Sequence, residues 1–334
     1  LNVREPNNKH YVYANYGWDD DEIDQFEMSP DSGYVQKCGT PEVYIDLVDN
    51  LSENAASENT YNEICNVLDV DEYAAYMATQ FYLGNWDWPQ NNVKGFRHKD
   101  NGRFRFVMFD LDGSFSSNDP INGFMNKEWY TFDQLYPTTL GRISDQIRFV
   151  TLFRNMLNNE KFRKKFIDTY CIVAGSVFDE NRVTGIINDL VKRVNPAMRL
   201  EGGAADNTAN RLKQNLSNRN DWAMNALKNY WPLDLFYTNV NLTSDTDNAA
   251  ILVNGIKVPT GQFNGGLFQP VTLRAVAPAG YEFLGWASNV ANQTAVLAAA
   301  STWKYYDQGS LDNTNWTSPS YAENGWKSGK APLG

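Results

Sequence analysis

The fold of this chain is decided by Asn85-Trp86-Asp87-Trp88-Pro89-Gln90-Asn91-Asn92-Val93 and by the later stretch Phe109-Asp110-Leu111-Asp112-Gly113. In the first stretch, Asn92 follows Asp87 by five residues, and Asp110 follows Asp87 by 23. The spacing therefore places a loop carboxylate, an amide and a second carboxylate in a fixed order along the chain.

The segment between the two stretches is predicted to be a β-hairpin. Val93–His98 and Arg103–Phe109 have the composition of strands, and the turn residues Lys99-Asp100-Asn101-Gly102 join them. Two antiparallel strands of similar length return the chain to its starting point. We therefore expect Asp110 to lie beside Asn92.

This layout is the one that protein kinases use for a catalytic base and two metal ligands. On that interpretation, Asp87 accepts the proton of the acceptor hydroxyl. Asn92 and Asp110 hold Mg²⁺ through oxygen atoms, and Asp112 is a further metal ligand. The alternative is that Asp87 is a helix cap or turn residue and Asn92 a turn residue, because a lone Asp-x-x-x-x-Asn is a weak signal.

The charge of the chain argues against a nucleic-acid partner. Its 334 residues include 40 acidic and 29 basic residues, for a net charge of -11, whereas phosphate backbones require clustered Lys and Arg. The single dense basic run, at 161–165, has the spacing of a solvated helix face.

The cysteines and the hydropathy pattern exclude further classes. Cys38, Cys65 and Cys171 are widely separated and lie far from both histidines, so they predict neither a zinc site nor a disulfide framework. The sequence holds no run of 18 apolar residues, and we expect no membrane span.

Residues 1–232 are predicted to form one α+β domain in which strands precede helices. Tyr11–Tyr16 has strand composition, and 71–84 has helical spacing. Helices are then expected around 147–157 and 162–173, from Asp179 to a stop before Pro196, and over 207–230.

The remaining sequence changes in composition. Short strand-like runs at 251–258, 271–277 and 282–286, separated by Gly-containing turns, predict a small all-β domain over 233–288. Residues 289–300 are expected to be a linker. Residues 301–334 are too few to fold alone without partners, and they carry Trp303, Trp316 and Trp326.

The segment Phe81–Phe115 resembles the core of the CotH family, which comprises atypical protein kinases similar to spore coat protein H and is also widespread in bacterial surface proteins. The family pattern reads approximately as Asn-Trp-Asp-Trp-Pro-x-Asn-Asn, a hairpin, and Asp-Leu-Asp-x-x-Phe. By this resemblance Asp87 matches the catalytic aspartate. Asn92 and Asp110 match the metal-binding residues that position the nucleotide cofactor.

The resemblance extends over about residues 1–230 and implies a kinase-like fold with a partial small lobe and a helical large lobe. It implies ATP with Mg²⁺ or Mn²⁺ as cofactors and a protein substrate with Ser or Thr acceptors. It also implies an extracytoplasmic location, at the cell surface or secreted. Residues 301–334 resemble the start of a galactose-binding-like β domain that is cut short.

The chain departs from the kinase pattern at several points. It has no glycine-rich phosphate loop, and no phosphate-binding Lys pairs with a helix Glu in a recognisable motif. Because the chain opens on Leu1 without a Met and ends abruptly, we expect a fragment with those strands upstream. Glu5 is either a nucleotide-site residue of the small lobe or a surface charge. Lys94-Gly95 and Gly113 stand where bulkier residues are expected.

Three alternatives to an active kinase stay open. Asp110-Leu111-Asp112-Gly113 following a strand resembles the first motif of haloacid-dehalogenase-like phosphatases, with Asp110 as nucleophile and Asp112 as acid/base. The domain could be a pseudokinase scaffold, because a fold does not guarantee chemistry. The aromatic-rich C-terminal part could bind a surface glycan or a protein, with Trp side chains stacking on sugar rings.

Overall fold

The structure, a computed structural model, describes residues 7–29, 32–85, 87–89, 91–100, 102–115, 140–230, 237–287, 302–311, 314–316, 318 and 321–330. The chain divides into two compact units, Leu1–Phe283 and Leu284–Gly334. The described part mixes α-helices with several small antiparallel sheets. The prediction of an α+β fold is confirmed at this level.

The first element is a helix, α1 (Lys9–Tyr16), and the predicted strand at Tyr11–Tyr16 is wrong. The side chain of Asn8 caps the helix by accepting a hydrogen bond from the His10 N–H at 2.9 Å. Gly17 ends it in the left-handed conformation, with φ at 73°. Capping at both ends outweighs the strand propensity of the aromatic residues between.

A four-stranded antiparallel sheet follows, in the order β2-β1-β3-β4. The strands are β1 (Ile23–Ser29), β2 (Gly33–Cys38), β3 (Lys94–His98) and β4 (Arg105–Phe106). β3 and β4 form the predicted hairpin, although β4 is shorter than expected. A Cβ at Gly95 would lie 2.6 Å from the ring of Phe26, so the packing explains why no bulkier residue stands there.

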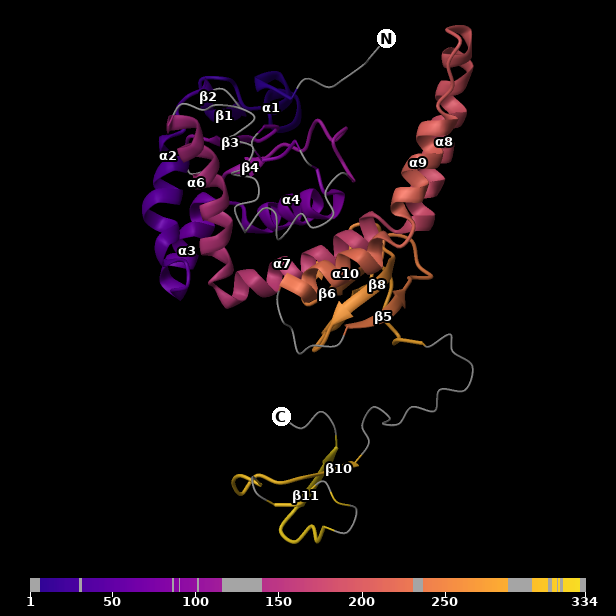
Figure 1. Cartoon of the computed structure of the whole chain (residues 1–334). Helices are drawn as coiled ribbons and strands as arrows, with labels where there is room; N and C mark the ends of the chain where they lie inside the picture. The colour runs from indigo at the N-terminus through magenta and orange to yellow at the C-terminus, as the bar shows by residue number, and fades with distance from the viewer. Residues whose placement is uncertain are drawn as a thin grey trace. The chain divides into compact units, whose positions relative to one another are not determined.

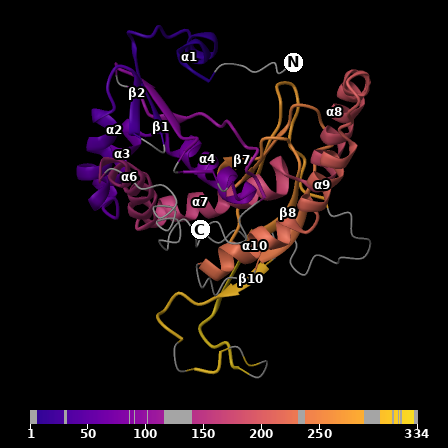
Figure 2. The ribbon, with the colours of Figure 1, turned by 45° about the horizontal axis from the view of Figure 1, so that its top comes forward.

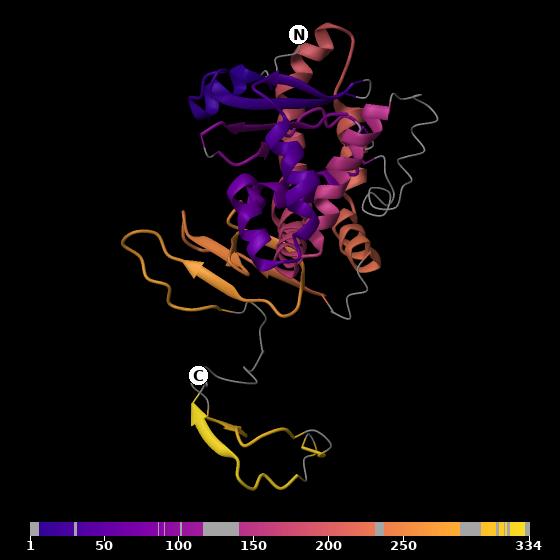
Figure 3. The same ribbon diagram turned by 90° about the vertical axis from the view of Figure 1, so that its left-hand side faces the viewer.

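The two faces of this sheet bury different clusters. Phe96 faces α1 and packs with Val12, Ile23 and Val107. Phe26 and Phe106 belong to the main core on the helical side. Within the first unit, Figure 3 shows this sheet at one end of the helical body and the strands of residues 237–276 at another.

The main core is built around α4 (Val70–Leu83), most of whose residues are buried. Before it come α2 (Glu42–Asp46), the π-helical turn η1 (Leu47–Leu51), the 3₁₀ turn η2 (Ser52–Asn54) and α3 (Glu58–Val67). The ring of Tyr73 in α4 contacts those of Phe153 and Phe162, which lie on two later helices. The ring of Phe81 contacts those of Phe153 and Phe166 on the same two helices. These are α6 (Leu140–Leu157) and α7 (Glu160–Ile172), and the two helical stripes predicted there are confirmed.

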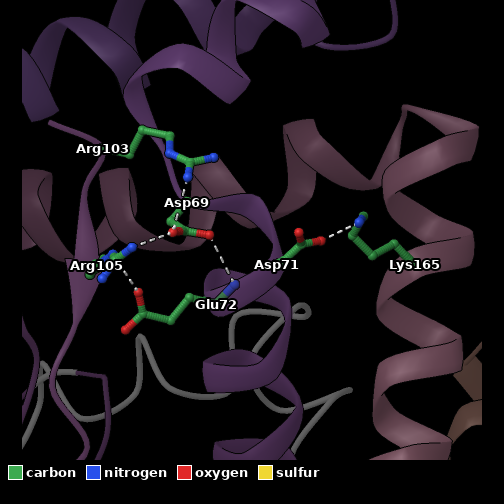
Figure 4. Close-up of polar contacts among 6 residues, drawn as sticks. All are labelled: Asp69, Asp71, Glu72, Arg103, Arg105 and Lys165. Carbon is green, nitrogen blue, oxygen red and sulfur yellow. Dashed lines mark hydrogen bonds and ion pairs between the residues drawn. The ribbon is translucent and has the colours of Figure 1, made fainter. Parts of the chain in front are cut away.

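Charged residues join the start of α4 to its neighbours (Figure 4). Asp69 caps the helix by accepting from the Glu72 N–H, and it accepts one hydrogen bond from Arg105 at 3.0 Å. Arg105 also pairs with Glu72 at 3.3 Å, and Asp71 pairs with Lys165 of α7. This network ties β4 and α7 to the same helix end.

Helix α8 (Glu180–Leu200) is longer than predicted, because it continues through Pro196. Proline removes one hydrogen bond from a helix interior. Here Asn195 ties the last turns to the next helix, donating to Asp206 at 2.9 Å and accepting from the Ala205 N–H at 2.8 Å. Figures 1 and 2 show α8 and its successor α9 side by side as a hairpin.

The single helix predicted over 207–230 is two helices, α9 (Asp206–Leu216) and α10 (Arg219–Tyr230). Asn218 separates them with a φ of 60°. Asn adopts this left-handed conformation more readily than most residues, so the chain turns there.

Five strands follow the helices in two small sheets, β5-β8 and β7-β6-β9. They are β5 (Tyr237–Leu242), β6 (Ala250–Val253), β7 (Ile256–Lys257), β8 (Phe263–Phe268) and β9 (Leu273–Val276). The run at 282–286, predicted as a strand, is irregular. Phe263 packs against Gly175 of the π-helical turn η4 (Val173–Val177), so these strands share the main core. The domain limits at 232 and 288 stay predictions.

The described residues of the second unit include an antiparallel pair of strands, β10 (Thr302–Tyr305) and β11 (Lys327–Lys330). The rings of Trp326 and Tyr306 lie 6.0 Å apart, whereas Trp316 is half exposed. The predicted linker at 289–300 lies outside the described residues. Glycan binding by these tryptophans stays a prediction.

Candidate active site

The described residues between 85 and 93 belong to the loop between α4 and β3. Gly84 ends α4 in the left-handed conformation, with φ at 59°. Trp88 then anchors the loop, because it is buried and its Nε1 donates to the Tyr76 hydroxyl at 2.9 Å. The ring also contacts Phe81 and Phe149 of the core. The residues on either side of Trp88 are thereby held at the edge of the core.

Asp87 is held by two amides that converge on one carboxylate oxygen. Asn92 donates to Oδ2 of Asp87 at 3.0 Å, and Asn91 donates to the same atom at 3.2 Å. Asn92 is buried and has a φ of 57°, a conformation that Asn tolerates. The five-residue spacing therefore produces a direct contact between Asp87 and Asn92.

The surroundings of Asp87 suit a proton acceptor. Burial raises the pKa of its carboxyl group, the hydrogen bonds from Asn91 and Asn92 oppose that rise, and the charges of Asp110 and Asp112 raise the pKa further. A general base works best when its pKa is raised towards the working pH. The same interactions show that the three carboxylates share one electrostatic neighbourhood.

Asp110 and Asp112 follow β4 on an exposed turn. Asp110 has a φ of 50°, and its carbonyl accepts a hydrogen bond from Asn85 at 3.4 Å. At the other end of the turn, the Phe115 N–H donates to the Leu83 carbonyl at 2.5 Å. Gly113 between them is buried. The hairpin thus brings residues 110–115 back to the end of α4, beside the loop that carries Asp87.

Three predicted residues offer oxygen atoms to a metal ion. The amide nitrogen of Asn92 is turned to Asp87, so its oxygen points away from that carboxylate and is suited to a cation. Asp110 and Asp112 are exposed carboxylates. This donor set fits a hard ion such as Mg²⁺. Within the described ranges, no three His, Cys, Asp or Glu side chains are grouped closely enough to hold a metal, so phosphate oxygens and water would have to complete the shell.

Sequence reasoning missed three contributors to this region. Asn85 and Asn91 contact the Asp87 segment through their side-chain amides. Lys94 stands where a bulkier residue was expected, and it is buried. Its Nζ lies 3.5 Å from Oε2 of Glu27 in β1 and donates to Oδ1 of Asn7 at 3.1 Å. Burial lowers the pKa of Lys94, and Glu27 opposes that change. The asparagines themselves were a signal in the sequence, whereas the pairing of Glu27 with Lys94 is visible only in the register of the folded sheet.

Comparison with known proteins gives one match. The family model described as CotH kinase protein matches residues 3–231, which include the whole site. No curated protein and no solved structure matched the chain at a significant level.

Proposed function

Because this chain belongs to the CotH kinase family, we propose that it transfers the γ-phosphate of ATP to a Ser or Thr hydroxyl of a protein substrate. The family supports a phosphotransferase that acts with a nucleotide and a metal. The identity of the nucleotide and of the acceptor residues is our proposal.

The observation that carries the proposal is the cluster around Asp87. Its carboxylate contacts Asn92 directly and lies within the electrostatic reach of Asp110 and Asp112. Carboxylates placed close together with a raised pKa are characteristic of functional sites, because neighbouring like charges destabilise the folded state. A phosphoryl-transfer site requires this combination of a base and oxygen ligands.

In the proposed reaction Asp87 orients the acceptor hydroxyl and takes its proton. The hydroxyl oxygen forms a bond to the γ-phosphorus, and the bond from that phosphorus to the bridging oxygen breaks. ADP leaves with the electron pair of the broken bond. Mg²⁺ or Mn²⁺, when bound, supplies charge neutralisation at the phosphates. Asn92, Asp110 and Asp112 are the residues that would hold it.

We further propose a kinase-like arrangement for residues 1–232, in which the β1–β4 sheet belongs to a partial small lobe and the helices from α4 onward form the large lobe. Residues 233–288, 289–300 and 301–334 are proposed as a β domain, a linker and a truncated β domain. We propose an extracytoplasmic location, at the cell surface or secreted. No helix in the described ranges is both long and apolar enough to cross a membrane.

Calorimetric titration of Mg²⁺-ATP and Mn²⁺-ATP tests the proposal. The chain is expected to bind ATP only with the metal, and Asp110→Ala is expected to abolish that binding. Asp100→Ala is the matched control, because Asp100 is an exposed carboxylate at the opposite end of the same hairpin. Binding by the Asp110 variant equal to that of the control would contradict the assignment of Asp110.

Assays of phosphate transfer and of phosphate-ester hydrolysis, made beside the titration, separate the alternatives. Metal-dependent binding without transfer would indicate a pseudokinase. Hydrolysis of a phosphate ester through a phospho-Asp110 intermediate would indicate the phosphatase. Every strand ladder among the described residues is antiparallel, whereas haloacid-dehalogenase-like enzymes use a doubly wound parallel sheet. The observations therefore favour the kinase.

A further inference from the structure

One buried amide lies between the two reacting segments of the candidate site. Asn85 is 5% exposed and directly follows Gly84 at the end of α4. Its Oδ1 accepts a hydrogen bond from the Asp87 N–H at 3.3 Å. Its Nδ2 donates to the Asp110 carbonyl at 3.4 Å. A single side chain thus contacts the segment of the proposed base and the segment of the proposed metal ligand.

The orientation of this amide is determined by its backbone partners. A backbone N–H can only donate and a carbonyl can only accept, so the oxygen of Asn85 must face Asp87 and its nitrogen must face Asp110. Gln80 of α4 contacts the same nitrogen, its Oε1 accepting at 3.4 Å. Gln80 is 1% exposed, so α4 itself supports the amide.

The contacted segments both need support. Asp110 has a φ of 50°, and Phe115 at the far end of its turn has a φ of 61°. Non-glycine residues in this region are disfavoured and persist where neighbouring contacts hold them. Asn85 binds the Asp110 carbonyl, and Leu83 binds the Phe115 N–H. Leu83 at the end of α4 and Asn85 just beyond it therefore anchor the two ends of the turn, and Asn85 also contacts Asp87.

We propose that Asn85 is a positioning residue that sets the separation of Asp87 and Asp110, an inference that rests on the proposed function. The contacts of 3.3 and 3.4 Å are long for hydrogen bonds, and such contacts tighten when a substrate completes a site. Loss of the amide therefore displaces the base and the metal ligand together. Residues that support metal ligands in this way typically contribute 10- to 100-fold to affinity or activity.

Two substitutions of Asn85 test its two hydrogen bonds separately. Asn85→Asp keeps an oxygen for the Asp87 N–H but replaces the donor to the Asp110 carbonyl with a repelling oxygen. We expect it to weaken Mg²⁺-ATP binding by about 10- to 100-fold while the Asp87 amide stays protected from hydrogen exchange. Asn85→Ala removes both contacts, so it is expected to lose that protection as well. A cooperative thermal unfolding transition serves as the check that each variant is folded.

Asn155→Ala is the matched control, since Asn155 is a half-buried amide that donates to Ser52 at 2.9 Å outside the site. Nucleotide binding by both Asn85 variants within twofold of this control would overturn the positioning role. So would unchanged exchange of the Asp87 amide in folded Asn85→Ala. If the unsubstituted chain binds no Mg²⁺-ATP, the proposed function is contradicted, and so is the role of Asn85 in nucleotide binding. The exchange measurement would still show whether Asn85 holds the Asp87 segment in place.

Discussion

The two ends of α4 both carry clustered acidic residues, but the clusters are built differently. At the start of the helix, Asp69 is bonded to Arg105 and caps the helix, and Asp71 is paired with Lys165 (Figure 4). Beyond its end, Asp87 is held by the neutral amides of Asn91 and Asn92. In the described part of the chain no Lys or Arg forms an ion pair with Asp87.

We propose that this difference in partners separates a structural cluster from a functional one. A carboxylate that is paired with a Lys or Arg side chain joins two elements of the fold. Its charge is largely neutralised, so it has little tendency to bind a proton or a metal ion. At the other end, the pKa of Asp87 is raised by burial and then by the charges of Asp110 and Asp112. A folded protein retains such repulsion where a substrate or metal relieves it.

The largest expected effect comes from Asp87→Asn. The substitution removes the proton acceptor, so phosphate transfer should fall by about 10²- to 10⁴-fold. ATP binding should be nearly unchanged, because the proposed metal ligands remain. Transfer is measured with radiolabelled ATP. Asp71→Asn, in the cluster at the other end of α4, serves as control. Normal transfer by Asp87→Asn would show that the two clusters do not differ as proposed.

At the structural end, Asp69→Ala should lower the free energy of unfolding by about 2 kcal/mol, because it removes a helix cap and an ion pair with Arg105. Asp69→Asn retains a capping oxygen and should recover about half of the loss. Urea unfolding measures both variants. A loss of nucleotide binding in stably folded Asp69→Asn would instead connect this cluster to the site.

Glu72 supplies a pH test of the same cluster. Burial raises its pKa to about 7, the charge of Arg105 lowers it, and Asp69 raises it. Because the folded state binds this proton more tightly than the unfolded state, the contribution of Glu72 to stability falls as pH rises from about 4.5 to 7. Glu72→Gln should remove that fall, which we expect to be about 1 kcal/mol since a third of the side chain is exposed to screening water.

Thermal unfolding from pH 4.5 to 8 measures this change. A Glu72→Gln protein with the same pH dependence as the unsubstituted chain would exclude Glu72 as its source.

The smallest expected effect is that of Asn91→Ala. Asn91 donates to Asp87 and so opposes the rise in the pKa of that carboxyl group. Its removal should raise the pKa further. A base must be deprotonated to act, so the acidic limb of the pH-rate profile should move to higher pH. A limb that moves to lower pH or stays in place would show that Asn91 does not tune the base.

Local sequence patterns predicted the elements whose own residues decide their conformation. The hairpin of β3 and β4 forms where its turn residues indicated, and the core stripes of α6 and α7 recur at helical spacing. The pattern failed at Tyr11–Tyr16, where capping by Asn8 and Gly17 accompanies a helix. It also failed at Pro196, where contacts of Asn195 with the next helix accompany an uninterrupted α8.

The sequence by itself determined the order and spacing of Asp87, Asn92 and Asp110, and with it the family, because a motif is a property of the chain. Only the tertiary structure decided that Asn85 contacts both segments and that Lys94 is buried beside Glu27. It also decided that burial, and to a smaller extent the charges of Asp110 and Asp112, raise the pKa of Asp87. Hydrogen bonds and Coulomb interactions act over a few ångströms, so they depend on folded distances that the spacing of residues along a chain does not specify.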